Sequence, residues 1–141
     1  MEITLKDIKF NKKAMVIAVL VAIAFSFAFW TWISPETLEK DMSINVGGNV
    51  GFDVNTTFIT FGTVPQDGIS IRGVIITNND NYDKLARFSA DGNISSFIQL
   101  PPDTLVKAHQ NTTVNAEAVV PWGAKYGEYT GKFKILLTRA I

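Results

Sequence analysis

Residues 14–33 read AMVIAVLVAIAFSFAFWTWI, a run of twenty residues without a charged side chain. A helix of this length matches the hydrocarbon core of a bilayer, which is about 30 Å thick. No polar face interrupts the run, whereas a helix on the surface of a soluble protein would carry one. The run therefore predicts a transmembrane helix.

The residues on either side of the run predict its orientation. Lys12 and Lys13 directly precede it, and Trp30 and Trp32 lie at its end. Basic residues stay on the cytoplasmic side, and tryptophans gather at membrane interfaces. We expect these four residues to anchor the helix at the two interfaces. Residues 1–13 are then a cytoplasmic basic tail, and everything after residue 33 is extracytoplasmic.

An uncleaved anchor is the favoured fate of the helix, with two alternatives open. Residues 31–38, TWISPETL, lack the small-residue site that follows a secretory signal. The Lys13-Ala14 junction has the basic pair of a prepilin-type cleavage site, but lacks the usual glycine before the cut and the glutamate after it. Cleavage at either place would release or trim the helix.

The charge and the cysteine content exclude several classes of function and of site. The chain has 141 residues and a formal net charge of zero. Residues 34–141 hold nine basic and eleven acidic side chains, so this part has no basic surplus for nucleic acid. There is no cysteine, which excludes disulfides, thiolate metal sites and a cysteine nucleophile. A disulfide-free extracytoplasmic domain favours a prokaryotic source, and within that class we expect an archaeal one.

Residues 34–41, SPETLEKD, are expected to form a short juxtamembrane stalk. Ser34 is a suitable N-cap and Pro35 a suitable first residue for one or two helical turns. Beyond this stalk the sequence changes character, because short runs of Val, Ile, Thr and Phe alternate with Gly, Asn, Asp and Pro. This pattern is typical of a β-sandwich, which we expect over residues 42–141.

Eight strands are predicted in this region. Val114, Ala116 and Ala118 alternate with polar residues, as do Phe133, Ile135 and Leu137, which is typical of half-buried antiparallel strands. Gly73 separates two pairs of isoleucine and valine residues of opposite parity, which suggests a bulge. The predicted strands are Met42–Val46, Gly51–Val54, Phe58–Phe61, Ser70–Asn78, Leu85–Ala90, Phe97–Leu100, Thr112–Val120 and Lys132–Arg139.

Five short segments in this part of the chain carry a resemblance: FGTVP (61–65), RGVIITN (72–78), LVKA (105–108), residues 114–120 and GEYTG (127–131). Together they resemble the immunoglobulin-like β-sandwich of the MSP/ASPM–Hydin kind over residues 57–139. Ala108-His109-Gln110 replaces the usual Pro-Gly, so that loop departs from the pattern. The resemblance implies an antiparallel sandwich that acts as a scaffold or binding module.

Trp122, Tyr126 and Tyr129 cluster in the segment PWGAKYGEY, residues 121–129. Aromatic residues interleaved with glycine in a loop can form a binding tip. Alternatively, Tyr129 and Trp122 seal the end of the sandwich core. Both interpretations stay open at this point.

Other polar motifs predict modification or turns rather than catalysis. Asn55, Asn93 and Asn111 begin N-glycosylation sequons on the side expected to be outside, which would make the protein a glycoprotein. The oxygen-rich segment Asn78–Asp83 could bind calcium, although Asn and Asp also favour turns. His109 is the only histidine and is expected at the surface. No catalytic, cofactor or metal site is predicted.

The sequence therefore predicts a mainly β, non-enzymatic protein with one membrane anchor. We expect an extracytoplasmic scaffold or adhesion module that joins the bilayer to a protein of the cell envelope or of a membrane complex, with a homo-oligomer possible. The alternative is a filament subunit of the archaellin or pilin kind, or an archaellum accessory protein that keeps its anchor. An enzyme is the third and least favoured class.

Overall fold

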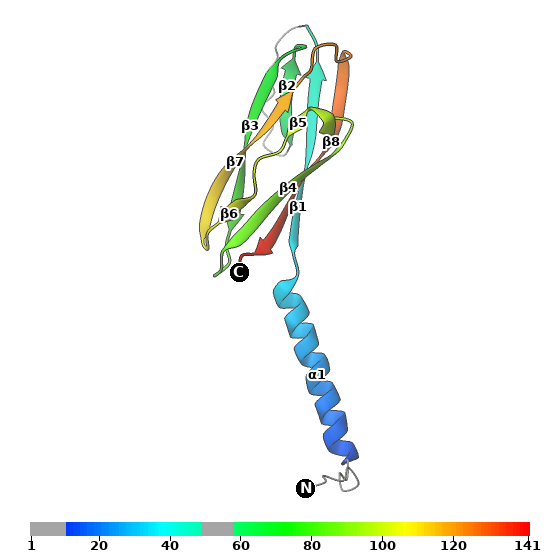
Figure 1. The fold of residues 1–141 in the computed structure, drawn as a ribbon, viewed down its shortest axis with the longest axis vertical. Coiled ribbons are helices and arrows are strands. Elements are labelled where there is room, and N and C mark those ends of the chain that lie inside the picture. Colours follow the sequence, from blue (N-terminus) through cyan, green and yellow to red (C-terminus); the bar gives the residue numbers. More distant parts are fainter. Residues whose placement is uncertain (1–10, 49–57) are drawn as a thin grey trace, which may run out of the picture. The chain divides into compact units, whose positions relative to one another are not determined.

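The computed structural model describes residues 11–48 and 58–141 of the chain. The chain divides into two compact units, Met1–Ser34 and Pro35–Ile141. Among the described residues, the first unit contains one helix, and the second, which we call the β domain, contains the strands. The expected combination of one N-terminal apolar helix and a mainly β domain is confirmed (Figure 1).

Helix α1 spans Lys12–Ile33 and has no buried residue. The side chain of Asn11 caps its first turn, accepting a hydrogen bond from the backbone N–H of Lys13 at 3.1 Å. The hydroxyl groups of Ser26 and Thr31 donate to the carbonyls of Ala22 and Ala28, at 2.8 and 2.9 Å. The hydroxyl groups within the apolar part therefore have hydrogen-bond partners inside the helix itself, as a hydrocarbon environment requires. The helix is long and apolar enough to span a membrane.

The β domain consists of two sheets around one apolar core (Figure 1). The five-stranded sheet has the order β2-β1-β8-β4-β6, and the three-stranded sheet has the order β3-β7-β5. Between the described strands, every pairing is antiparallel except β1 with β2. The strands are β1 (Glu36–Val46), β2 (Ile59–Val64), β3 (Ile69–Asn78), β4 (Lys84–Gly92), β5 (Ile98–Gln99), β6 (Thr104–Val106), β7 (Gln110–Val119) and β8 (Gly127–Arg139).

Residues that the two period-two patterns predicted form part of the core. Val114, Ala116 and Ala118 of β7 are buried, and Phe133 and Ile135 of β8 face them from the other sheet as part of the same core cluster. Alternate residues of these strands therefore supply the two inner faces, and the polar residues between them point outward.

The ladder between β1 and β8 defines the two ends of the β domain. Glu36 pairs with Leu137 at one end, and Val46 pairs with Gly127 at the other. We call these the Glu36 end and the Val46 end. Eleven residues of extended strand place them about 35 Å apart. The chain arrives from α1 at the Glu36 end, where β8 also finishes (Figure 1).

Three local predictions are corrected by the structure. The helical stalk over residues 34–41 is wrong, because Glu36–Asp41 pairs with Leu137–Lys132 as the first half of β1. The bulge at Gly73 is also wrong, since β3 pairs with β7 in one unbroken register from Ile69 to Asn78. Phe97 ends a short 3₁₀ turn, Ser95–Phe97, rather than starting a strand. The predicted strand Gly51–Val54 lies outside the described residues.

Candidate functional site

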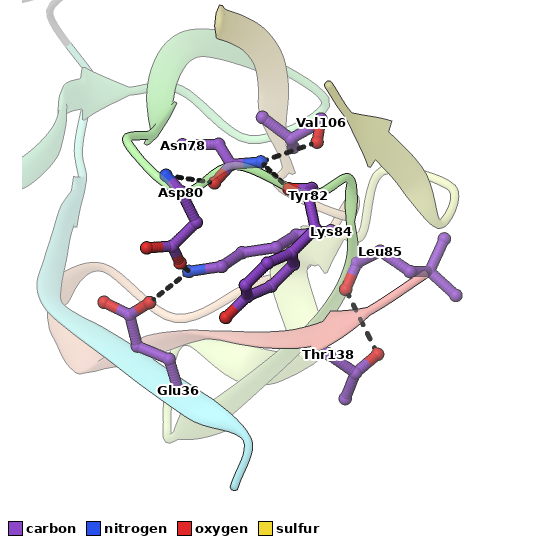
Figure 2. A network of polar contacts seen from close by, with 8 residues as sticks. All are labelled: Glu36, Asn78, Asp80, Tyr82, Lys84, Leu85, Val106 and Thr138. Carbon is purple, nitrogen blue, oxygen red and sulfur yellow. Dashed lines mark hydrogen bonds and ion pairs between the residues drawn. The ribbon is translucent and has the colours of Figure 1, made fainter. Parts of the chain in front are cut away.

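A buried lysine joins the start of β1 to the turn between β3 and β4 (Figure 2). The Lys84 side chain is only 9% exposed, and its Nζ lies 2.8 Å from Glu36 Oε2 and 2.6 Å from Asp80 Oδ2. We call Lys84, Glu36 and Asp80 the Lys84 clamp. A lysine ammonium held between two carboxylates ties three segments together at the Glu36 end.

The electrostatics of the clamp favour its charged form. Burial alone would lower the pKa of Lys84, but hydrogen bonds to Asp80 and Glu36 raise the pKa above the ordinary 10.5. The hydrogen bond from the Lys84 ammonium likewise holds the pKa of Asp80 below the ordinary 3.8. The Tyr82 ring adds a cation–π contact, with the Arg139 guanidinium 4.4 Å from its centroid.

The oxygen-rich segment Asn78–Asp83 uses its side chains within the β domain. Buried Asn78 donates from Nδ2 to the carbonyls of Tyr82 and Val106, at 2.8 and 3.0 Å, and its Oδ1 accepts from the Asp80 N–H (Figure 2). Asp83 Oδ1 accepts from the Ala108 N–H at 2.9 Å. These bonds support the interpretation as a turn over the calcium interpretation. Within the described residues, no group of three His, Asp or Glu side chains could hold a metal ion.

His109 lies near this turn at the surface. Its side chain is exposed, and its Nε2 lies 2.7 Å from Asn81 Oδ1. Its backbone has a positive φ of 56°, a conformation that is uncommon for residues other than glycine but in which Asn, Asp and His are enriched. This position is the one where the chain departs from the Pro-Gly of the resembled pattern.

The loop between β7 and β8 presents two aromatic rings to solvent. Trp122 is 82% exposed and Tyr126 is 66% exposed, whereas Tyr129, the third predicted residue, is half-buried. We call residues 121–126 the aromatic loop. It lies at the Val46 end, directly before Gly127, and so at the opposite end of the β domain from Glu36.

The aromatic loop is held in place by its own backbone and by its neighbours. The Ala124 N–H donates to the Pro121 carbonyl at 3.1 Å, and the Ala124 carbonyl accepts from Gln66 Nε2 at 2.7 Å. Ala124 also packs against the core. Gly123 has a φ of +88°, which only glycine adopts without strain. The exposed rings therefore project from a fixed turn, which reduces the entropy lost on binding.

Tyr129 has a structural role in supporting this loop. Its ring packs edge-on against Phe97, with centroids 4.7 Å apart, and its hydroxyl donates to the Lys125 carbonyl at 2.8 Å. Tyr129 thus helps to seal the core, as one of the two interpretations expected. Trp122 does not, because its ring is almost fully exposed.

The other predicted site residues lie at the surface. Asn93 is exposed, and its Oδ1 accepts from the Thr130 N–H at 2.7 Å, which leaves Nδ2, the atom that a glycan would join. Asn111 is exposed in β7, and Asn55 lies outside the described residues. Lys12 and Lys13 form the first turn of α1, and Trp30 and Trp32 lie in its last turn with exposed rings.

An isoleucine stripe on β3 was missed at the level of sequence. Ile69, Ile71 and Ile75 are 60%, 52% and 64% exposed on the outer face of the three-stranded sheet. Arg72, the charged residue of this strand, faces the core side, where its Nε donates to the Thr60 carbonyl at 2.7 Å. The bulge expected at Gly73 hid this stripe, because it would have turned Ile69 and Ile71 toward the core. Without the bulge, as the unbroken register shows, both side chains lie on the outer face.

Comparison with known proteins adds no family to these observations. The chain matches no family model, no curated protein and no solved structure.

Proposed function

We propose that this protein is a non-enzymatic membrane-anchored tether with an immunoglobulin-like extracytoplasmic domain. In this proposal α1 crosses the membrane once, with Lys12 and Lys13 on the cytoplasmic side, and the β domain binds a protein of the cell envelope or of a membrane complex through the aromatic loop. Sequons at Asn93 and Asn111 would then be accessible to glycosylation.

One observation carries the proposal: two exposed aromatic rings stand on a fixed turn at the end of the β domain opposite the point where the chain arrives from α1. Trp and Tyr are the residues most often found at the energetic centre of protein interfaces. Neither ring contributes to the core, so the fold gives no reason for their exposure. A tether needs its attachment and its contact surface at different ends, and the strand order provides this.

The test is site-specific photo-crosslinking in native membranes. A photoreactive phenylalanine analogue replaces Trp122 in the full-length protein, and the same analogue replaces exposed Ser89 on β4 as the matched control. We expect one dominant crosslinked envelope or membrane protein from position 122 and none from position 89. Trp122→Ala should reduce co-purification of that same protein. Identical crosslinks from both positions, or none from position 122, would contradict the proposal.

Intact mass, measured in the same experiment, separates the alternative function. A bait that begins at Met1 agrees with a retained anchor. A bait trimmed near Ala14 and crosslinked mainly to further copies of itself would instead indicate a filament subunit of the archaellin or pilin kind. The apolar helix and β head are compatible with both plans.

A further inference from the structure

We infer that the β domain is built to resist force that enters through β1, by loading the β1–β8 ladder in shear. The inference rests on the proposed tethering function, because a tether transmits force between its anchor and its partner. Only Ser34 and Pro35 separate the last residue of α1 from the first residue of β1. Any pull on the helix is therefore applied directly to the Glu36 end of β1.

The strand order determines how that pull acts. A partner on the aromatic loop pulls on β8 at Gly127, which pairs with Val46, while the anchor pulls on β1 at Glu36, which pairs with Leu137. The two antiparallel strands are thus pulled in opposite directions along their length. Their hydrogen bonds are perpendicular to the strands, so all eleven paired positions share the load at once.

The other possible direction of pull is weaker. The C-terminal end of β8 lies beside Glu36, so a force between Ser34 and Ile141 would separate the strands from one end. The pairs would then open one after another, beginning with Glu36 and Leu137. The same ladder should therefore resist force well in one direction and poorly in the other.

The Lys84 clamp reinforces the half of β1 that has fewer neighbours. Met42–Val46 is held on both sides, by β8 and by β2. Glu36–Asp41 pairs only with β8 among the described strands. Lys84 holds Glu36 at 2.8 Å, at the residue where force would first reach this half.

Single-molecule force spectroscopy tests the inference on the full-length protein in nanodiscs. The chain has no cysteine, so introduced cysteines give unique attachment points. The tether geometry uses Ser34→Cys with Trp122→Cys, and the peeling geometry uses Ser34→Cys with Ile141→Cys; all three positions are exposed. We expect an unfolding force about twofold or more higher in the tether geometry. Equal forces, or a higher force in the peeling geometry, would overturn the inference.

A second pair of variants tests the clamp. Glu36→Gln should lower the unfolding force in the tether geometry, whereas Glu128→Gln, on the same strand pair at the Val46 end, should leave it unchanged. Equal effects of the two changes would refute the role of the clamp. No partner takes part in these measurements, so their outcome is independent of whether the aromatic loop binds one.

Discussion

The buried ammonium of Lys84 lies 2.8 Å from the carboxylate of Glu36, a residue 48 positions earlier in the chain. This contact fixes the start of β1, the segment for which the sequence predicted a helical stalk. We expect Glu36→Gln to lower the free energy of unfolding by about 1 kcal/mol, because a mostly desolvated ammonium loses one of its two charged partners. Urea unfolding of the full-length protein in detergent measures the change. Glu128→Gln is the matched control, and equal midpoints for both variants would contradict the prediction.

Two carboxyl groups with lowered pKa values, those of Asp80 and Asp91, predict that the fold loses stability in acid. Hydrogen bonds from Lys84 and Lys134 lower the pKa values of Asp80 and Asp91 below the ordinary 3.8. A carboxyl group whose pKa is lower in the folded state stabilises the fold above its unfolded pKa and loses that effect as pH falls through its folded pKa. We therefore expect the urea concentration at the midpoint of unfolding to decrease as the pH is lowered below about 4.

The double variant Asp80→Asn with Asp91→Asn is the check on this assignment. It should unfold more easily than the parent near neutral pH and should lose less stability on acidification. A parent and a double variant with parallel pH profiles would show that other groups cause the acid effect.

Gly131 of β8, which pairs with Gly92 of β4, should not tolerate a side chain. A Cβ at Gly131 would collide with the backbone oxygen of Asp91, which cannot move without disturbing the ladder. We expect Gly131→Ala to cost about 2–3 kcal/mol of unfolding free energy. Gly73→Ala on β3 is the control, because a Cβ there would lie 3.4 Å from Thr113 Cγ2. Similar urea midpoints for the two alanine variants would contradict this.

The aromatic residues near β8 should separate into one that stabilises the fold and two that do not. Tyr129→Ala removes the edge-on contact with Phe97 and should cost about 2 kcal/mol. Trp122→Ala and Tyr126→Ala should change the unfolding free energy by less than about 0.5 kcal/mol, since both rings are exposed. Thermal unfolding measures all three. A large loss in Trp122→Ala would mean that this ring supports the fold rather than a partner.

Cysteine labelling tests the proposed orientation of the helix. A membrane-impermeant thiol reagent should label Ser96→Cys, an exposed position of the β domain, in intact cells. Asn11→Cys, directly before α1, should be labelled only after the membrane is permeabilised. The parent chain has no cysteine and gives the background. The reverse pattern would place the β domain in the cytoplasm.

The sequence predicted those parts of the fold in which local pattern and burial agree. The apolar run from Ala14 to Ile33 lies within α1, and the alternation in β7 and β8 identified the buried faces. The first half of β1 escaped prediction because Glu36–Glu39 is exposed on both faces and therefore has no alternation. Its strand conformation comes from pairing with β8, which outweighs the local preference for a helix cap.

The candidate site was predicted only as a group of residues. Trp122, Tyr126 and Tyr129 were recognised together, but sequence could not separate the half-buried ring from the exposed ones. That distinction depends on Phe97 and Gln66, which are distant in the chain and reach the loop only through the fold. The Lys84 clamp went unnoticed for the same reason, because its partners lie on different strands and turns.

The pairing of β1 with β8 also has a consequence for biosynthesis. Among the described strands β1 is made first and β8 last, so partners such as Glu36 and Leu137 are separated by about a hundred residues. At ribosomal rates of about 5–20 residues per second, β1 waits for roughly 5–20 s before its partner exists. The β1–β8 ladder can close only after Gly127–Arg139 has been synthesised. Throughout that interval β1 lacks β8, the described strand that pairs with all eleven of its residues.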